Sequence, residues 1–283
     1  MKISISGIRG VYGTDFFPQD VIRFCDGFSK LIKNGKCVIG RDTRTTGEMI
    51  EKLVSATLLE KGIDVQILGV TPTPVVFRKA RELGAGIVIT SSHNPLEWNG
   101  LKFIIEGRGI TEKELEVVKN ERNSNRPKLG KESIGISNYV SDAVKVIGKL
   151  EQEKYVTVDI GGGSAKCVAP ELLKEIGCQV TTINDELGTC TRGPDPTADE
   201  LTELISKTKQ VGFAFDLDSD RMILVMNGKK KSSDITLGLG VVKAIKLGIK
   251  KFVLSLDSSI CLLYTSDAAD DMQCVDLGGR RII

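Results

Sequence analysis

The chain has 283 residues, a net charge of +2 and 5% aromatic residues, so neither a basic face for nucleic acid nor a base-stacking surface is indicated. It contains no apolar run near the roughly 20 residues that span a bilayer, and no signal-peptide segment. Seven cysteines without Cys-x-x-Cys spacing and a single histidine argue against structural zinc. We expect a cytoplasmic protein of about two domains with reduced thiols and with no nucleic-acid or membrane partner, and its oligomeric state stays open.

Helices and strands alternate along the first part of the chain. The predicted elements are a helix over 18–33, a strand over 36–39, a helix over 46–61, a strand over 64–68, a helix over 76–83 and a strand over 85–89. This alternation is typical of parallel βαβ units with helices on both faces of a sheet. The loops that follow the strands, 40–45, 69–74 and 90–99, should converge on one edge of the sheet, where α/β proteins bind ligands.

A second α/β unit follows a polar connection over 114–135. Its predicted elements are strands over 154–159, 179–183 and 211–215 and helices over 169–176 and 199–208, after which a helix over 234–247 and a strand over 251–256 open a third unit. Residues 261–283 show neither helical nor strand periodicity. We therefore expect domains at 1–137 and 138–232, the start of a third at 233–260, and a non-native or disordered tail at 261–283.

The single histidine lies in an unusual loop. The apolar run Ala85–Ile89 leads directly into Thr90–Pro95, which contains two serines, His93 and a helix-breaking Asn-Pro pair. Such a loop presents hydroxyl groups at the end of a strand, and Ser92 is the candidate phosphate carrier, with Ser91 as its rival. Taken alone, the loop is more typical of an ordinary Asn-Pro turn whose serines bond the local backbone.

Three carboxylates follow the last strand of the second unit. Asp216, Asp218 and Asp220 alternate along the chain directly after the apolar strand, where the backbone begins to turn into a loop. Alternate carboxylates at such a place can wrap one hard cation, and without a cation they would repel each other. The alternative is a solvated acidic turn. Arg221, next to them, suits a phosphate oxygen because guanidinium groups bind phosphate in bidentate fashion.

Glycine-rich segments give weaker signals. Gly161–Gly163 follows a strand but lacks both the dinucleotide-binding spacing and the lysine of a P-loop, so a tight strand-to-helix turn is the better prediction. Gly7–Gly10 and Gly40–Arg44 each place arginine among glycines. Singly, either segment is typical of a surface turn.

Together, these segments resemble a known family. In order and spacing they are similar to the α-D-phosphohexomutase superfamily, which comprises phosphoglucomutase, phosphomannomutase and phosphoglucosamine mutase. The resemblance covers roughly residues 3 to 258 and rests on Ser6–Gly10, Gly40–Arg44, Pro72–Pro74, Thr90–Pro95 with Asn99–Lys102, and Asp216–Arg221. It implies two consecutive α/β domains with mixed, mainly parallel sheets plus the start of a third. The family's sugar-recognition and distal phosphate-binding loops do not appear.

The resemblance also implies site residues. The catalytic group would be Ser92, as the phosphoserine, with His93, Lys102 and Arg9. The metal group, for Mg²⁺, would be Ser92, Asp216, Asp218 and Asp220. The phosphate- or substrate-binding group would be Arg221, Arg41, Arg44 and Asn94. In this reading Lys102 acts as a base with a depressed pKa.

The implied reaction interconverts hexose 1-phosphate and hexose 6-phosphate through phosphorylated Ser92 and a hexose 1,6-bisphosphate. The phosphosugar is phosphoglucosamine, phosphomannose or phosphoglucose. One alternative is a fragment that binds metal and phosphate ligands without turnover. A metal phosphatase that uses Asp216 as its nucleophile is a third possibility, disfavoured because its acidic motif belongs at a first strand.

Overall fold

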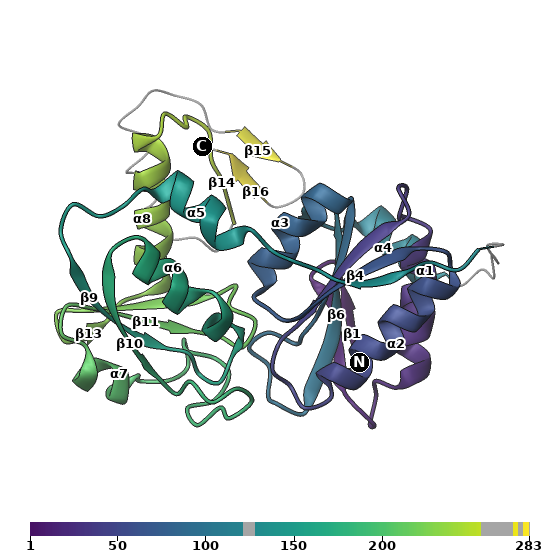
Figure 1. Cartoon of the computed structure of the whole chain (residues 1–283), viewed down its shortest axis with the longest axis horizontal. Helices are drawn as coiled ribbons and strands as arrows, with labels where there is room; N and C mark the ends of the chain where they lie inside the picture. The colour runs from purple at the N-terminus through teal and green to yellow at the C-terminus, as the bar shows by residue number, and fades with distance from the viewer. Residues whose placement is uncertain (121–127, 256–273, 277–279, 283) are drawn as a thin grey trace.

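The computed structural model describes residues 1–120, 128–255, 274–276 and 280–282. Two α/β units lie side by side, joined by an extended segment that leads into helix α5 (Figure 1). Among the described residues, no helix combines the length and the apolar character needed to cross a membrane. The prediction of two consecutive α/β domains with mixed sheets is confirmed.

The first unit is built on a sheet of eight described strands, which we call sheet I. Across the sheet they are β1 (Lys2–Ser4), β2 (Gly7–Val11), β6 (Trp98–Ile105), β5 (Ala85–Ile89), β3 (Lys36–Arg41), β4 (Asp64–Val70) and β8 (Glu132–Ile134), with β7 (Arg108–Gly109) beside β6. Strands β5, β3, β4 and β8 run parallel. Strand β6 returns antiparallel to β5 and joins β2 and β1 to the sheet. The loops after β3, β4 and β5 therefore do leave from one edge.

Helices cover both faces of sheet I. One face carries α1 (Pro18–Ser29), α2 (Gly47–Glu60) and α4 (Glu112–Lys119), and the other carries α3 (Thr73–Leu83) (Figure 1). Helix α1 begins at Pro18, where proline costs no helical hydrogen bond, and the Asp20 carboxylate caps the free Phe17 N–H at 3.0 Å. Its buried side chains recur at helical spacing and fill the larger core of the domain.

The second unit has the same layered plan. Its sheet II runs β10 (Cys178–Ile183), β9 (Lys154–Asp159), β11 (Val211–Phe215), β12 (Met222–Met226) and β13 (Lys229–Lys230), of which the first three are parallel. Helices α5 (Tyr139–Ile147) and α6 (Ala169–Glu175) pack on one face and α7 (Thr202–Lys207) on the other.

Two local predictions in the second unit have different outcomes. The glycine run 161–163 forms the predicted tight turn, with positive φ at Gly161 and Gly162, before a short 3-10 helix, Ser164–Cys167. The helix predicted over 199–208 is shorter, because it starts only at Thr202. The Asp199 carboxylate accepts the Leu201 N–H at 2.6 Å, and Leu201 has a left-handed φ of 55°, which a helix does not accommodate.

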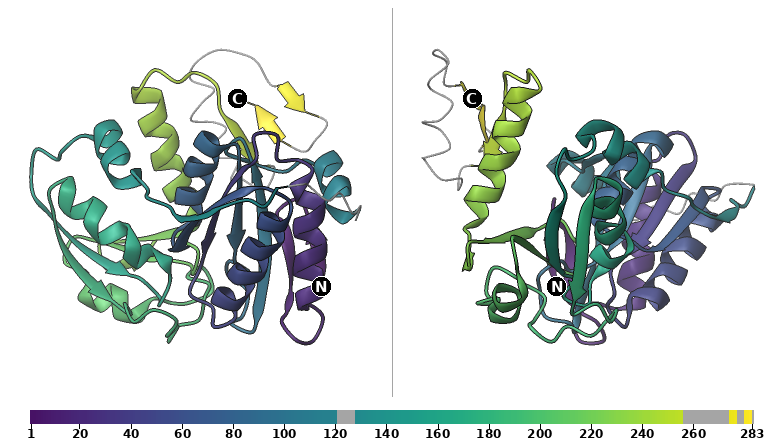
Figure 2. Two further views of the ribbon diagram at one scale, coloured as in Figure 1. Left: turned by 45° about the vertical axis from the view of Figure 1, so that its right-hand side comes forward. Right: turned by 60° about the vertical axis from the view of Figure 1, so that its left-hand side comes forward.

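The expected start of a third unit consists of α8 (Ser233–Lys246) and β14 (Val253–Ser255). Helix α8 approaches sheet II at β12 but projects beyond it (Figure 2). It buries none of its residues; Leu239, for example, is 56% exposed. Strand β14 pairs with β16 (Arg280–Ile282), which pairs with β15 (Cys274–Asp276). The rest of the predicted tail lies outside the described residues.

Candidate active site

The loop that follows β5, residues 90–98 (the serine loop), places Ser92 at the boundary between the two domains. The Ser92 hydroxyl donates a hydrogen bond to Asp216 Oδ2 at 2.9 Å, across 124 residues of sequence. Ser92 adopts a left-handed φ of 55°, a conformation that costs a non-glycine residue on the order of 1 kcal/mol and persists only where its surroundings hold it. Ser91 is fully buried, and its hydroxyl accepts from the Asn94 amide instead. Ser92 is therefore the serine whose hydroxyl faces the carboxylates.

The three aspartates of the second unit gather at the end of β11. Each of Asp216, Asp218 and Asp220 offers a carboxylate oxygen within 4.8 Å of the others, and the first two are buried. Asp218 Oδ1 is buried without any hydrogen-bond partner. An unsatisfied buried carboxylate oxygen in such a cluster fits a hard cation with oxygen ligands. The predicted metal residues are thus brought together, and they could hold an ion.

Polar side chains of the first unit reach over these carboxylates. Lys102 Nζ on β6 donates to both Asp218 Oδ2 and Asp220 Oδ2 at 2.6 Å. Thr73, the first residue of α3, donates its hydroxyl to Asp218 Oδ2 at 2.7 Å and its backbone N–H to the Asp218 carbonyl at 2.8 Å. The cluster therefore joins both domains.

The charges in this cluster shift one another's pKa values. Burial, together with repulsion from Asp218 and Asp220, raises the pKa of Asp216 far above the usual carboxyl range. Burial acts in the same direction on Asp218, but the ammonium of Lys102 outweighs it and lowers the pKa of Asp218. Burial alone would lower the pKa of Lys102, but the two carboxylates outweigh it and the pKa is raised. The predicted depressed pKa of Lys102 is therefore wrong in this structure.

A cleft of about 880 Å³ opens above the carboxylates, between the two domains. Its lining includes six of the residues proposed from sequence, Arg9, Ser92, His93, Lys102, Asp220 and Arg221. His93 Nδ1 lies 3.5 Å from Ser92 Oγ, and burial, with the nearby positive charge of Arg221, lowers the pKa of His93. The cleft combines a hydroxyl, a neutral imidazole and several cationic groups, which suits an anionic substrate such as a phosphate ester.

Arg9 and Arg221 retain donors for such a ligand. Arg9 Nη2 bonds the Ser6 carbonyl at 3.1 Å, while its Nε is buried without a partner. Arg221 gives its backbone N–H to Asp216 Oδ1 at 3.1 Å, and its guanidinium lies 4.0 Å from Asp195 Oδ2. The Arg221 side chain is 42% exposed toward the cleft, so it can turn to a phosphate.

Three residues predicted to bind phosphate or substrate lie elsewhere. Arg41 pairs with Glu51 of α2 at 3.5 Å and does not line the cleft. Arg44 has no exposed side-chain surface, and every nitrogen of its guanidinium is bonded within the protein. Asn94 turns its amide back to the Ser91 carbonyl and hydroxyl, each at 3.0 Å. The donors of Arg44 are all committed to buried partners, which leaves none for phosphate. Arg41 Nε is buried without a hydrogen-bond partner, so the role predicted for Arg41 stays a prediction.

Sequence reasoning missed residues that support the site. Thr73 was noted only as part of a Pro-Thr-Pro segment, although it bonds a metal-cluster carboxylate from another domain. Asp42 and Thr90 are fully buried and bonded to each other at 2.6 Å beneath the serine loop. Asp42 and Thr90 are polar residues that come at the end of apolar strands, and this position is the one sequence signal that could have singled them out. The signal does not predict that the two side chains bond each other.

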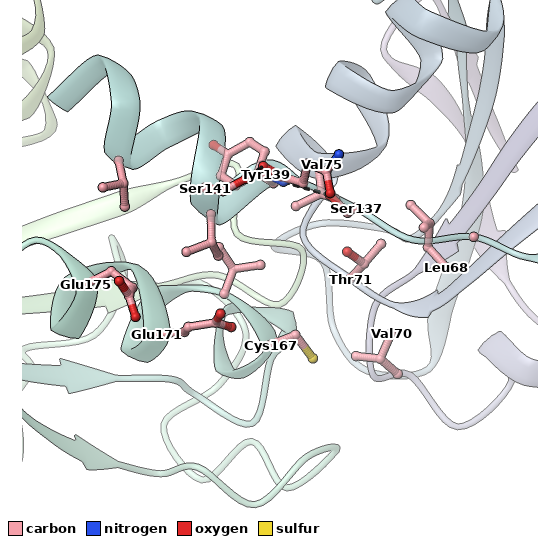
Figure 3. A pocket seen from close by; sticks show the side chains of 15 residues that line it. Leu68, Val70, Thr71, Val75, Ser137, Tyr139, Ser141, Cys167, Glu171 and Glu175 are labelled. Atoms are coloured by element: carbon pink, nitrogen blue, oxygen red, sulfur yellow. Dashed lines mark hydrogen bonds between the residues drawn. The ribbon is translucent and has the colours of Figure 1, made fainter. Parts of the chain in front are cut away.

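A second cavity of about 630 Å³ lies between the two domains, beside the segment that connects them (Figure 3). Its walls include Thr71 and Val75 from the first unit and Cys167 and Glu171 from the second, and Tyr139 lines both cavities. None of the residues proposed from sequence lines it. Six of those residues line the cleft above the carboxylates instead.

Comparison with known proteins identifies both domains. Residues 1–128 match the phosphoglucomutase/phosphomannomutase alpha/beta/alpha domain I, and residues 137–229 match domain II of the same proteins. The chain belongs to this family. It is 35% identical to a Methanosphaera stadtmanae protein named "Probable phosphoglucosamine mutase", over 97% of this chain and 63% of that protein. It is 33% identical to a phosphoglucosamine mutase of Methanococcus maripaludis, over 92% of this chain and 62% of the relative.

Solved structures of phosphohexomutases share this fold. A phosphoglucomutase/phosphomannomutase family protein from Burkholderia thailandensis superposes with a TM-score of 0.74 at 25% identity, covering 87% of this chain and 60% of that one. Parafusin, a phosphoglucomutase from Paramecium in an open form, superposes with a TM-score of 0.68 at 18% identity. The match covers 95% of this chain and 60% of parafusin. The chain thus spans about three fifths of the relatives it matches.

Proposed function

We propose that this chain carries the phosphoseryl half of a Mg²⁺-dependent phosphohexomutase, an enzyme that moves a phosphoryl group between C1 and C6 of a hexose phosphate. One observation carries the proposal: the Ser92 hydroxyl is hydrogen-bonded to one member of a three-carboxylate cluster, at the floor of a cationic cleft. A nucleophilic hydroxyl beside a hard-cation site is the arrangement that metal-assisted phosphoryl transfer requires.

In the proposed cycle, phosphorylated Ser92 gives its phosphoryl group to the free hydroxyl of a hexose 1-phosphate or 6-phosphate. The products are a hexose 1,6-bisphosphate and free Ser92, and the bisphosphate, after turning over in the cleft, returns its other phosphoryl group to Ser92. Mg²⁺ bound by Asp216, Asp218 and Asp220 would neutralise charge on the phosphoryl group in transit. Added hexose 1,6-bisphosphate serves as the activator, because it phosphorylates free Ser92.

The protein's own groups supply the proton transfers. The hexose hydroxyl loses a proton as it attacks, and Ser92 gains one as it leaves. His93 is suited to accept a proton, because its lowered pKa keeps the imidazole neutral at pH 7. Lys102, whose pKa is raised, holds a proton at the same pH and can donate it. Arg9 and Arg221 would hold the phosphate oxygens.

Phosphoglucosamine is the first substrate to assay, because the two curated relatives described above carry that name. Phosphomannose and phosphoglucose are the alternatives. The chain spans about three fifths of those relatives, so binding of metal and phosphate ligands without turnover is the second candidate function. The free thiols of the described cysteines fit the predicted cytoplasmic location.

The test is phosphate transfer to Ser92. The chain is incubated with Mg²⁺ and glucose 1,6-bisphosphate, and phosphate is mapped by peptide mass spectrometry. We expect one phosphate on Ser92, retained in the variant Ser91→Ala and reduced by more than about 1,000-fold in Ser92→Ala, which lacks the nucleophile. Phosphate on Ser91, or undiminished labelling of Ser92→Ala, would refute the assignment. Absence of any phosphate on the folded wild-type chain would favour the second candidate function.

A further inference from the structure

We propose that Asp42, Arg44 and Thr90, here called the loop anchor, are positioning residues that hold Ser92 in its reactive conformation. This inference rests on the proposed role of Ser92 in phosphoryl transfer. None of the three was predicted to act in this way, and Arg44 was predicted to bind phosphate.

Arg44 crosses beneath the serine loop and bonds its backbone at several points. Its Nη2 donates to the carbonyl of Ser92 and to that of Asn94, both at 2.7 Å. Its Nη1 donates to the carbonyl of Trp98 at 2.8 Å and also to that of Pro95. One rigid, planar guanidinium thus fixes four carbonyls along the loop, which a flexible ammonium with a single nitrogen could not do.

Asp42 fixes Arg44 in turn. Its Oδ2 accepts from Arg44 Nε at 3.1 Å, and its Oδ1 accepts the Arg44 backbone N–H at 3.0 Å. Both side chains are completely buried. A buried arginine retains its charge, and it is tolerated only when a counter-charge and acceptors surround it, as they do here.

Thr90 links the same carboxylate to the backbone of Ser92. Its hydroxyl donates to Asp42 Oδ2 at 2.6 Å and accepts the Ser92 N–H at 2.8 Å. The N–H of Ser92 is therefore held through Thr90 and its carbonyl through Arg44. Holding both backbone groups of one residue explains how Ser92 keeps the left-handed φ of 55°, which directs its hydroxyl to Asp216.

Other parts of the molecule contact the loop less extensively. Asn94 closes the loop on Ser91, and the Tyr12 backbone N–H bonds the Glu97 carbonyl of the loop at 3.3 Å. Neither contact acts on Ser92 itself. The loop anchor is therefore the part of the first domain that determines where the nucleophile lies, while Asp216 of the second domain receives its hydroxyl.

The decisive experiment compares Arg44→Lys and Thr90→Val with wild type in the full chain. The rate of Ser92 phosphorylation by glucose 1,6-bisphosphate and Mg²⁺ is measured per folded molecule, well below the melting temperature of every variant. We expect a loss of about 100-fold in Arg44→Lys, since displacing a reacting atom by about 1 Å costs that much. Thr90→Val, which loses one hydroxyl, should lose about tenfold. The Mg²⁺ affinity, set chiefly by the carboxylates of Asp216, Asp218 and Asp220, should stay within about twofold of wild type in both.

A control separates positioning from stability. Lys61→Met breaks a buried ion pair with Asp26, 2.7 Å long, in the same domain but away from the loop. It should lower the melting temperature because it leaves a buried charge unpaired, yet leave the phosphorylation rate per folded molecule unchanged. Equal rates in wild type, Arg44→Lys and Thr90→Val would overturn the inference. So would a rate loss in Lys61→Met as large as that in Arg44→Lys.

Hydrogen exchange of the serine loop provides a readout that does not need activity. In Arg44→Lys and Thr90→Val, backbone amides of residues 91–98 should exchange at least about tenfold faster than in wild type, while those of sheet II should be unchanged. If the wild-type chain takes up no phosphate, the proposed function fails, and this exchange comparison still decides the inference. Unchanged exchange in the loop of both variants would refute it.

Discussion

The two domains contribute to the cleft in different ways. In the first domain, the serine loop is held by groups of that same domain, chiefly Arg44 and its partner Asp42. In the second, the buried carboxylates of Asp216 and Asp218 receive hydroxyl and ammonium groups from the first domain. The nucleophile is therefore positioned within its own domain, whereas the carboxylate cluster depends on the neighbouring domain or on a cation to offset its charge.

Removal of the Lys102 ammonium group, which lies in the first domain and bonds carboxylates of the second, should have the largest effect on phosphoryl transfer. In Lys102→Met, Asp218 and Asp220 lose their shared counter-charge, and the cleft loses its proton donor. We expect the rate of phosphoryl transfer from Ser92 to glucose 6-phosphate to fall by a factor of about 10² to 10⁴. Single-turnover experiments measure this rate. Lys52→Met, which removes an exposed lysine paired with Glu48, is the control and should be unaffected. A rate within threefold of wild type in Lys102→Met would show that this lysine has no part in the reaction.

The pH dependence of stability should differ between the domains as well. Burial and repulsion from its neighbours raise the pKa of Asp216 in the folded chain, so the folded state favours the protonated carboxyl. Its contribution to stability is therefore present at low pH and is lost as the pH rises from about 4 through the raised pKa. The lowered pKa of Asp218 makes stability depend on pH only below about pH 4, and the raised pKa of Lys102 only above about pH 10. Neither group therefore changes the stability between about pH 5 and pH 8.

Thermal unfolding in a chelator, between about pH 5 and pH 8, measures this effect. We expect the wild type to lose stability with rising pH relative to Asp216→Asn, by at most about 1.4 kcal/mol per pH unit. Mg²⁺ should remove much of the difference, because a bound cation favours the ionised carboxylates. The same pH slope in wild type and Asp216→Asn would contradict the described electrostatics of the cluster.

The smallest effect is expected for the exposed contact between the domains. Arg78 on α3 bonds Asp142 on α5 through Nε at 3.2 Å and Nη2 at 2.8 Å. Since the pair is partly exposed, Arg78→Ala should cost no more than about 1 kcal/mol of unfolding free energy, and less at high salt. Chemical denaturation at two salt concentrations checks this. A cost of several kcal/mol would mean that the domains depend on this surface contact rather than on the buried carboxylate cluster.

Much of this arrangement could be predicted from local patterns. Alternating periodicities indicated both α/β units, and the apolar strand before three aspartates indicated where the carboxylates gather. Contacts between Ser92 and Asp216 could be expected only from the family resemblance, because they join positions 124 residues apart. Local signals carry no information about such distances.

The errors share one physical cause. Arg44 lies in a glycine-flanked segment that looks suited to phosphate, yet its guanidinium is paired with a carboxylate of its own domain and has no donor left. The depressed pKa of Lys102 followed from the base role that the resemblance implies, but in the fold the nearby carboxylates outweigh burial and raise this pKa. In each case the sequence indicates the type of group correctly, while its partner, and so its chemistry, is decided by tertiary contacts.

The central claim is that the two domains form one cation-dependent phosphoryl-transfer site. The most direct measurement is the amount of phosphate on Ser92 as a function of Mg²⁺ concentration, with glucose 1,6-bisphosphate as donor, in wild type and in Asp218→Asn. We predict a saturable rise with Mg²⁺ in the wild type, no labelling in a chelator, and at least about a tenfold higher Mg²⁺ requirement in the variant. Labelling that is independent of Mg²⁺, or identical in the two proteins, would contradict the account.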